Sequence, residues 1–190
     1  MTFSLTTGRL ILGDLQERDR SNLRLLARDP AFQKYVLVWL DTEEQIDTFL
    51  RHAIEEANAK DRQDYTLAAR EKGTGAFAGL TFIVIDPRYP TSAEFGIALL
   101  PAFCKNGYGT EILESFLAFG FTTLGMHRVF GKCDEQNIPS ARMMERCGLV
   151  YEGTIREHVW LRDHWRSTRY YGMLAGEYSS RSKKGGNNTW

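Results

Sequence analysis

The feature that most constrains the fold of this chain is a strand, a glycine-rich turn and a helix that follow one another near its middle. Residues 94–100 form a strand-like run that ends at Pro101, and the turn Lys105-Asn106-Gly107-Tyr108-Gly109-Thr110 opens a helical pattern. Glycines let the backbone turn tightly and let an anion approach the backbone N–H groups. The positive end of the helix dipole adds to that attraction. The turn therefore predicts an anion site, although the same turn also occurs without a ligand.

Hydrophobic periodicity places further helices and strands around this unit. The clearest helix begins with the capping box Thr42-Glu43-Glu44-Gln45, followed by apolar residues at three- and four-residue steps. Another helix is predicted over residues 14–28, before a stop at Asp29-Pro30. The remaining predicted elements are strands at 9–12, 66–70, 77–85, 93–100, 128–133, 159–161 and 165–173, and helices from 107 and at 139–147. The last two strands form a hairpin around Arg162-Asp163-His164.

This order of elements indicates a single domain of mixed α+β class. Helices come first, then an antiparallel meander, then strand–helix–strand–helix–strand. The 190 residues suffice for one domain with a substantial core, which we expect over residues 1–178. Residues 179–190 are rich in Ser, Lys, Gly and Asn, so a disordered tail is expected there.

The composition excludes several classes of protein. Lys and Arg together number 24, as do Asp and Glu, so no basic excess points to a nucleic-acid partner. No apolar run approaches the roughly 20 residues that span a bilayer. The three cysteines are odd in number and scattered, which favours the cytoplasm over a disulfide framework. The cysteines and histidines lack metal-ligand spacing, so no metal is expected.

A second chemical signal lies about 30 residues after the glycine-rich turn. Asn137-Ile138-Pro139-Ser140 places two polar side chains at the predicted start of a helix that ends near Cys147-Gly148. Helix capping explains either residue alone. The ordered combination of this motif with the turn is what favours a binding site.

Further motifs complete an ordered set. Thr7-Gly8-Arg9-Leu10-Ile11-Leu12 opens it, Ala93-Glu94-Phe95-Gly96-Ile97 precedes the turn, and Cys147-Gly148-Leu149 and Arg156-Glu157 follow. Over roughly residues 5–178, this set resembles the GNAT superfamily of N-acetyltransferases, and within it the RimJ/RimL-like branch, which acetylates protein N-terminal amines. The resemblance implies a central, twisted, mostly antiparallel sheet with one splayed parallel strand pair and flanking helices.

The resemblance also implies a reaction and a set of site residues. An amine attacks the thioester of acetyl-CoA, a cosubstrate, without an acyl-enzyme intermediate. Glu94 is the candidate base, with a solvated strand-end carboxylate as its alternative, and Ser140 hydrogen-bonds the departing thiolate. Backbone N–H groups near Leu99 and Leu100 stabilise the oxyanion, and Asn137 holds the pantetheine arm. The remaining cofactor-binding candidates are Lys105, Asn106, Gly107, Tyr108, Gly109, Thr110, Arg142 and Arg146, the two arginines being simply solvated in the alternative reading.

Two positions depart from the superfamily pattern. Cys104 replaces the first residue of the glycine-rich motif, and Met144 stands where many members have a tyrosine acid. Both departures suit an alternative reading as a catalytically idle acyl-CoA-binding module. A small-molecule amine, such as a polyamine or an aminoglycoside antibiotic, is the other alternative to a protein N-terminus. The aromatic cluster Trp160, Trp165, Tyr170 and Tyr171 is explained by core packing, by a wall of the acceptor cleft or by a homodimer contact.

Overall fold

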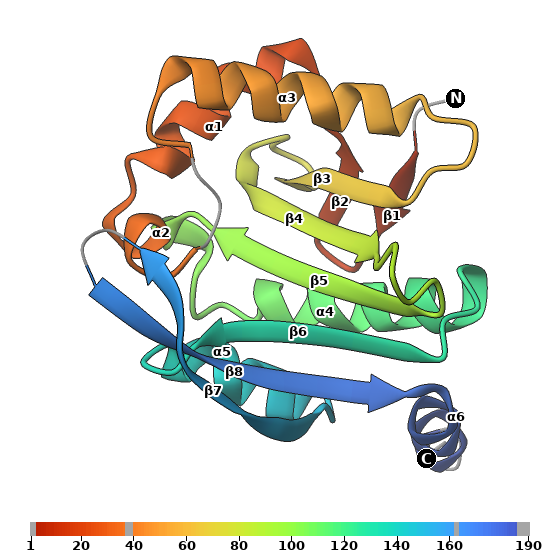
Figure 1. Ribbon diagram of the computed structural model, residues 1–190. Coiled ribbons are helices and arrows are strands. Elements are labelled where there is room, and N and C mark those ends of the chain that lie inside the picture. The colour runs from red at the N-terminus through yellow and green to blue at the C-terminus, as the bar shows by residue number, and fades with distance from the viewer. Residues whose placement is uncertain (1–2, 37–39, 162–163, 186–190) are drawn as a thin grey trace.

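The computed structural model describes residues 3–36, 40–161 and 164–185, with side chains as far as Arg181 (Figure 1). Its strands are β1 (Ser4–Thr6), β2 (Leu10–Asp14), β3 (Asp64–Glu71), β4 (Phe77–Ile85), β5 (Ser92–Leu99), β6 (Arg128–Asp134), β7 (Val150–Leu161) and β8 (His164–Leu174). Its helices are α1 (Arg20–Ala27), α2 (Pro30–Tyr35), α3 (Glu43–Ala57), α4 (Tyr108–Ala118), α5 (Ile138–Arg146) and α6 (Ala175–Gly185). Shorter turns are η1 (Glu17–Asp19), η2 (Pro101–Phe103) and the π-helical η3 (Phe119–Thr123).

The strands form one eight-stranded sheet in the order β1-β2-β3-β4-β5-β6-β8-β7. Neighbouring strands are antiparallel except β5 and β6, which α4 connects as a parallel pair. Their register joins Ser92 to Arg128 and ends with Phe95 and Gly131, after which both strands continue apart. The predicted mostly antiparallel sheet with one splayed parallel pair is therefore confirmed.

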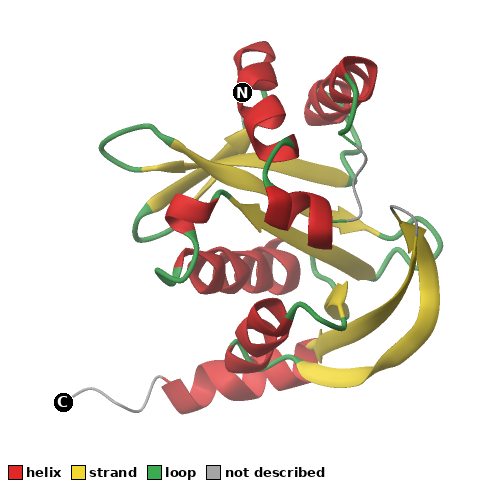
Figure 2. Cartoon of the chain, turned by 90° about the vertical axis from the view of Figure 1, so that its left-hand side faces the viewer, coloured by secondary structure: helices red, strands yellow, loops and turns green. Residues whose placement is uncertain are grey.

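Helices cover both faces of the sheet and divide the core in two (Figure 2). On one face, α4 and α5 bury side chains such as Ile112 and Phe116 against Val129 of β6. On the other face, α1, α2 and α3 bury Leu23 and Leu50 against β3 and β4. Fully burying side chains of this size stabilises the fold by roughly 1.5–3 kcal/mol each.

Helix α3 has the capping box and the apolar face that the sequence predicts. Thr42 Oγ1 accepts the Gln45 N–H at 3.2 Å, and Gln45 Oε1 accepts the Thr42 N–H at 3.1 Å. The capping box therefore satisfies two backbone donors that the helix itself leaves unpaired. Ile46, Leu50 and Ala53 form the buried face of the helix.

Several element boundaries differ from the prediction. The helix expected over residues 14–28 begins only at η1, because β2 extends to Asp14. Asp29-Pro30 ends α1, but it also starts α2, since Asp29 Oδ1 accepts the Phe32 N–H at 2.9 Å. The tail expected to be disordered from Ser179 instead continues α6 to Gly185. The predicted turn residues Arg162 and Asp163 lie outside the described residues.

Candidate functional site

The glycine-rich turn ends in a helix start that leaves backbone donors open. Gly107 has φ 84°, in the left-handed region that favours glycine, and Lys105 has φ 62°. The first backbone bond of α4 runs from Glu111 N–H to Gly107 O at 3.1 Å, so the amides of Tyr108, Gly109 and Thr110 precede the hydrogen-bond ladder. No side chain of the described residues caps this helix. These amides and the helix dipole can bind an anionic group.

The side chains of the turn are placed less uniformly than its backbone. Lys105 and Asn106 are exposed, and the Asn106 amide donates to Ala102 O at 3.3 Å. Tyr108 is buried, and its hydroxyl donates to Glu71 Oε1 at 2.7 Å. That bond lowers the pKa of Glu71 and raises the pKa of Tyr108. The phenol thus lies against β3, and any contact of Tyr108 with a ligand in the turn belongs to its backbone.

Gly109 lies where α4 and α5 approach each other closely. A Cβ at this position would lie 2.8 Å from Met143 Sδ and 3.9 Å from Leu99 Cδ1. A larger side chain would therefore fill the space between the start of α4, α5 and the end of β5. Gly109 is needed for this close approach whether or not a ligand binds.

Along β5, the backbone N–H and C=O groups of only every second residue point toward the gap beside β6. Leu100 N–H donates to Ala78 O of the β4 side at 2.9 Å, and Asp86 N–H donates to Ser92 O at 2.8 Å. In an antiparallel ladder these residues and every second one between them point toward β4. Leu99 therefore directs its amide toward the β6 side, where an oxyanion donor is expected, whereas the Leu100 amide already donates to Ala78 O.

Ser140 and Asn137 meet at the start of α5. Asn137 Oδ1 accepts the Ser140 N–H at 3.2 Å, so the capping alternative holds for this oxygen. Burial raises the pKa of the Cys133 thiol on β6 to about 11, and a hydrogen bond with the Ser140 side chain opposes that rise. The Ser140 hydroxyl thus lies between α5 and β6, on the α4–α5 side of the sheet.

Glu94 lies on the opposite face of the sheet. Its neighbours Ala93 and Phe95 belong to the core beneath α4, so Glu94 points to the other side. There Glu94 Oε2 pairs with Lys132 Nζ at 3.0 Å, and about a quarter of each side chain is exposed. Lys132 and Cys133 are consecutive on β6, so their side chains point to opposite faces of the sheet. Glu94, which pairs with Lys132, and Ser140, which contacts Cys133, therefore lie on opposite faces near the β5–β6 gap.

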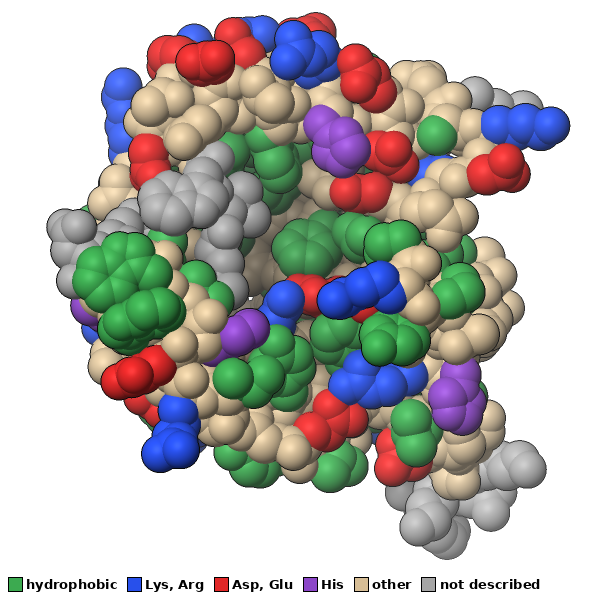
Figure 3. Space-filling view, viewed as in Figure 1, with side chains coloured by type: hydrophobic (Ala, Val, Ile, Leu, Met, Phe, Trp, Pro, Cys, Tyr) green, Lys and Arg blue, Asp and Glu red, His purple; other side chains and the backbone are tan. Residues whose placement is uncertain are grey.

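A second ion pair lies farther along the Glu94 face. Asp134 Oδ2 of β6 and Arg166 Nη1 of β8 are 2.9 Å apart and buried, and Arg166 also donates to Lys34 O of α2. Lys132, Asp134 and Arg166 are functional candidates that the sequence prediction missed. The alternation of residues along β6 is the signal that could have placed Lys132 and Asp134 on one face of that strand. Seen from the side opposite α4 and α5, this face is hollowed, with apolar, acidic and basic side chains around the hollow (Figure 3).

The other predicted site residues fall at the edge of this arrangement. Arg142 and Arg146 are exposed on α5. This exposure is compatible with binding of CoA phosphates and equally with side chains that only contact solvent. Met144 is 1% exposed and packs in the core with side chains of α4. Among the described residues, no group of three or more His, Cys, Asp or Glu could hold a metal ion, and no helix is long and apolar enough to cross a membrane.

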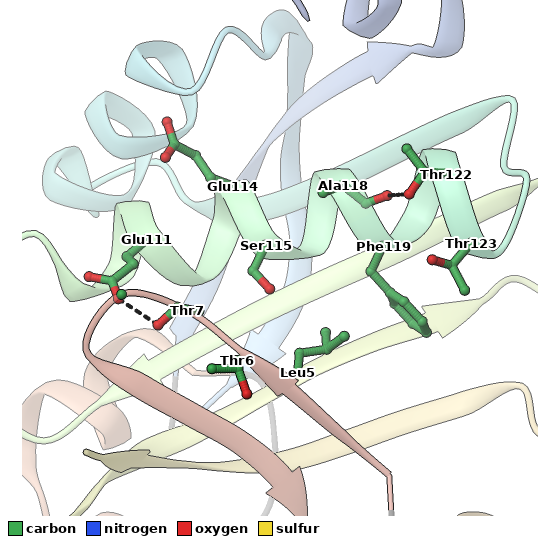
Figure 4. A pocket seen from close by; sticks show the side chains of 11 residues that line it. Leu5, Thr6, Thr7, Glu111, Glu114, Ser115, Ala118, Phe119, Thr122 and Thr123 are labelled. Atoms are coloured by element: carbon green, nitrogen blue, oxygen red, sulfur yellow. Dashed lines mark hydrogen bonds between the residues drawn. The ribbon is translucent and has the colours of Figure 1, made fainter. Parts of the chain in front are cut away.

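A separate groove of about 460 Å³ lies between α4 and the β1–β2 hairpin (Figure 4). Leu5, Thr7, Glu111, Ser115 and Phe119 are among the residues that line it. Thr7 Oγ1 donates to Glu111 Oε1 at 2.5 Å across it. This groove lies on the outer side of α4, away from Glu94 and Ser140.

Known proteins share this architecture. The chain is 23% identical over 177 residues to the uncharacterized N-acetyltransferase YnaD of Bacillus subtilis, covering 92% of this chain and 99% of that protein. A putative ribosomal-protein-serine acetyltransferase of Vibrio cholerae has a TM-score of 0.75 at 20% identity, over 90% of this chain and 97% of that one. A spermidine N-acetyltransferase of Vibrio cholerae, solved with CoA and spermine, has a TM-score of 0.76 at 19% identity, over 90% and 98%.

The structural likenesses show the fold, and the family follows from the sequence. Residues 9–150, well over half of the chain, match the family described as the acetyltransferase (GNAT) domain. The chain therefore belongs to the GNAT family of N-acetyltransferases, whose general reaction is the acetylation of an amine with acetyl-CoA as the acyl donor.

Proposed function

We propose that this enzyme acetylates the α-amino group of a protein or peptide N-terminus, as the RimJ/RimL-like branch does. The observation that carries the proposal is the charge balance of the hollowed sheet face. The carboxylates of Glu94 and Asp134, on this face of β5 and β6, are each paired with a cation, Lys132 or Arg166. A floor on which these two carboxylates are each neutralised by a cation suits an acceptor with one amine better than one with several ammonium groups.

In this proposal, the donor and the acceptor reach the β5–β6 gap from opposite sides of the sheet. The amides at the start of α4 bind the pyrophosphate of acetyl-CoA, and Asn137 Nδ2 holds the pantetheine arm. The acceptor amine enters on the Glu94 face. An α-amino group titrates near pH 8, so a fraction is already neutral at cellular pH and needs only modest help from a base. Positioning of the amine beside the thioester supplies much of the rate enhancement.

Three groups then act on the reacting atoms. Glu94, directly or through water, takes the proton that the attacking amine loses. The Leu99 amide hydrogen-bonds the oxyanion of the tetrahedral intermediate. The Ser140 hydroxyl hydrogen-bonds the sulfur as the thiolate departs; because a serine hydroxyl is a weak acid, its contribution is orientation more than proton donation.

The proposal extends to location and assembly. The three cysteines are free thiols, which suits the reducing cytoplasm. Tyr171 is part of the core, but Trp160 and Trp165 are about half exposed and in contact, with ring centroids 5.4 Å apart. Core packing therefore explains Tyr171. A homodimer contact at the two tryptophans stays a prediction, which light scattering of wild type and Trp160→Ser can check.

Acetylation of a small amine is the second candidate. Its support is the structural likeness to the spermidine N-acetyltransferase, whose TM-score of 0.76 compares with 0.75 for the ribosomal-protein-serine acetyltransferase. The family's general reaction counts against the reading as an idle acyl-CoA-binding module.

A panel of acceptors tests the proposal through release of the CoA thiol. We expect turnover with a peptide that has a free N-terminus, and none with the same peptide blocked at its N-terminus and carrying a lysine. Spermidine, spermine and an aminoglycoside should give kcat/KM values at least about tenfold lower, because each carries several cations to a neutral floor. Preferred turnover of a polyamine would replace the N-terminal acceptor by the second candidate.

A further inference from the structure

The arginine of the opening motif, Arg9, reaches across the fold to the glycine-rich turn. It lies just before β2, yet its Nη1 donates to Asn106 O at 3.0 Å and its Nε donates to Glu111 Oε2 at 2.9 Å. Its guanidinium also lies over the Tyr108 ring, 4.1 Å from the centroid. Arg9 therefore contacts the turn before α4, the first residue of α4 and its first turn.

Glu111 gives these contacts an electrostatic meaning. It is an acidic residue in the first turn of α4, close to the amides that we propose for the pyrophosphate. An uncompensated carboxylate there would repel the phosphates. Burial alone would raise the pKa of Glu111, but hydrogen bonds from the Thr7 side chain and from the backbone and guanidinium of Arg9 outweigh it, and the pKa is lowered. Glu111 is thus held as an anion whose charge Arg9 balances.

The guanidinium also restricts the path of the turn. Arg9 Nη2 lies 3.3 Å from the position that a Cβ would take on Gly107. The Asn106 carbonyl, immediately before Gly107, is bound by the same guanidinium. With the left-handed φ of Gly107, these contacts fix the direction in which the Tyr108, Gly109 and Thr110 amides point.

We infer that Arg9 is a positioning residue for acetyl-CoA, which fixes the glycine-rich turn and neutralises Glu111 so that the start of α4 presents a net attraction to phosphate. This inference rests on the proposed binding of the pyrophosphate at the start of α4. It predicts a role in binding the donor and none in the chemical step, because Arg9 lies outside the β5–β6 gap.

Substitutions of Arg9 and Glu111 separate the two parts of this role. Arg9→Gln should raise both the KM and the calorimetric Kd for acetyl-CoA by about tenfold or more, with kcat changed by less than about twofold. Arg9→Lys, which keeps the charge but not the fork, should recover part of the loss. Arg9→Gln combined with Glu111→Gln should recover more, because the uncompensated carboxylate is then absent.

A matched control and a fold check complete the experiment. Arg24 makes a similar exposed contact with Glu43, with Nη2–Oε2 at 2.6 Å, far from the turn, so Arg24→Gln should leave the Kd unchanged. Far-UV circular dichroism and thermal unfolding establish that each variant is folded. If Arg9→Gln does not fold, the Kd and KM of Arg9→Lys are compared with those of wild type instead. Wild-type affinity in Arg9→Gln, or a double variant no better than Arg9→Gln, overturns the inference. If Gly109→Trp binds acetyl-CoA as wild type does, the proposed binding site itself is wrong, which is a different result.

Discussion

The Ser140 hydroxyl can be separated from the helix cap beside it. The cap consists of Asn137 Oδ1 and the backbone N–H of Ser140, whereas the hydroxyl faces Cys133. A substitution that removes only the hydroxyl therefore leaves the start of α5 intact. Activity and stability should respond independently at this residue.

Ser140→Ala should lower kcat by roughly 10- to 100-fold, with a smaller change in the KM for acetyl-CoA, because one hydrogen bond to a charged thiolate is worth about 1.5–3 kcal/mol. Steady-state kinetics with a saturating acceptor measures this change.

Asn137→Ala should instead lower the free energy of unfolding by about 1 kcal/mol through loss of the cap. Thr122→Ala, which removes a hydroxyl bound to Ala118 O on α4, is the control. Unchanged kcat in Ser140→Ala would leave that hydroxyl a packing group.

For single residues, the sequence motifs predict which residues take part in the site, but they do not predict where the side chains point. Glu94 and Ser140 were identifiable from motifs, but their positions on opposite faces depend on strand parity and on the packing of α4 and α5. The Tyr108 hydroxyl binds Glu71, 37 residues away, through a contact that only the sheet creates. Lys132 was missed because its partner Glu94 lies on a neighbouring strand, and pattern reading along one strand does not show partners across strands.

The start of α4 is the element on which the proposed binding of the donor depends. Gly109 occupies the narrow space between α4, Met143 of α5 and Leu99 of β5. A Cβ there conflicts only with the flexible end of Met143, so a methyl group can be accommodated, whereas an indole cannot. Size at this position should therefore control access to the amides.

Gly109→Trp should abolish measurable binding of acetyl-CoA in calorimetry, while Gly109→Ala should retain affinity within a few-fold. Gly176→Trp is a control, because nothing lies within 4 Å of a Cβ at Gly176 on α6. Thermal unfolding of each variant distinguishes a blocked site from a misfolded one. Wild-type affinity in a folded Gly109→Trp would exclude this turn from the site.

Elements with strong local signals were predictable, and elements defined by their neighbours were not. α3 has a capping box and a regular apolar face, and its start at Glu43 agrees with the prediction. β1 is three residues long and exists through its pairing with β2. β7 is mostly exposed at the sheet edge and has an irregular register with β8 between Ile155 and Val159, so the alternation that marks a strand is weak.

The whole fold shields two thiols in the core between the sheet and the α4–α5 layer. Burial raises the pKa of Cys133 and of Cys147 from 9.0 to about 11. Below pH 9 both thiols are protonated in the folded and the unfolded chain. Between pH 9 and about 11 the unfolded chain releases these protons while the folded chain keeps them, so stability falls as pH rises.

Each buried thiol should therefore contribute about 2–3 kcal/mol to the loss of unfolding free energy over this pH range, as an upper estimate. Urea unfolding under reducing conditions at about pH 8 and about pH 10.5 measures the loss. Cys147→Ala should be less stable at neutral pH but should lose less on going to alkaline pH. Cys104→Ala, at the exposed thiol, should behave closer to wild type. Equal pH dependence in Cys147→Ala and wild type would contradict this account.

The separation of β5 from β6 after Phe95 and Gly131 has a kinetic consequence. In the proposed arrangement the two substrates arrive from opposite faces of one sheet, so neither has to leave before the other enters. Both must be present together for the acetyl group to pass directly between them. Initial-rate measurements in which both concentrations are varied should then give intersecting, not parallel, double-reciprocal lines, and CoA should compete with acetyl-CoA while leaving the acceptor's entrance open.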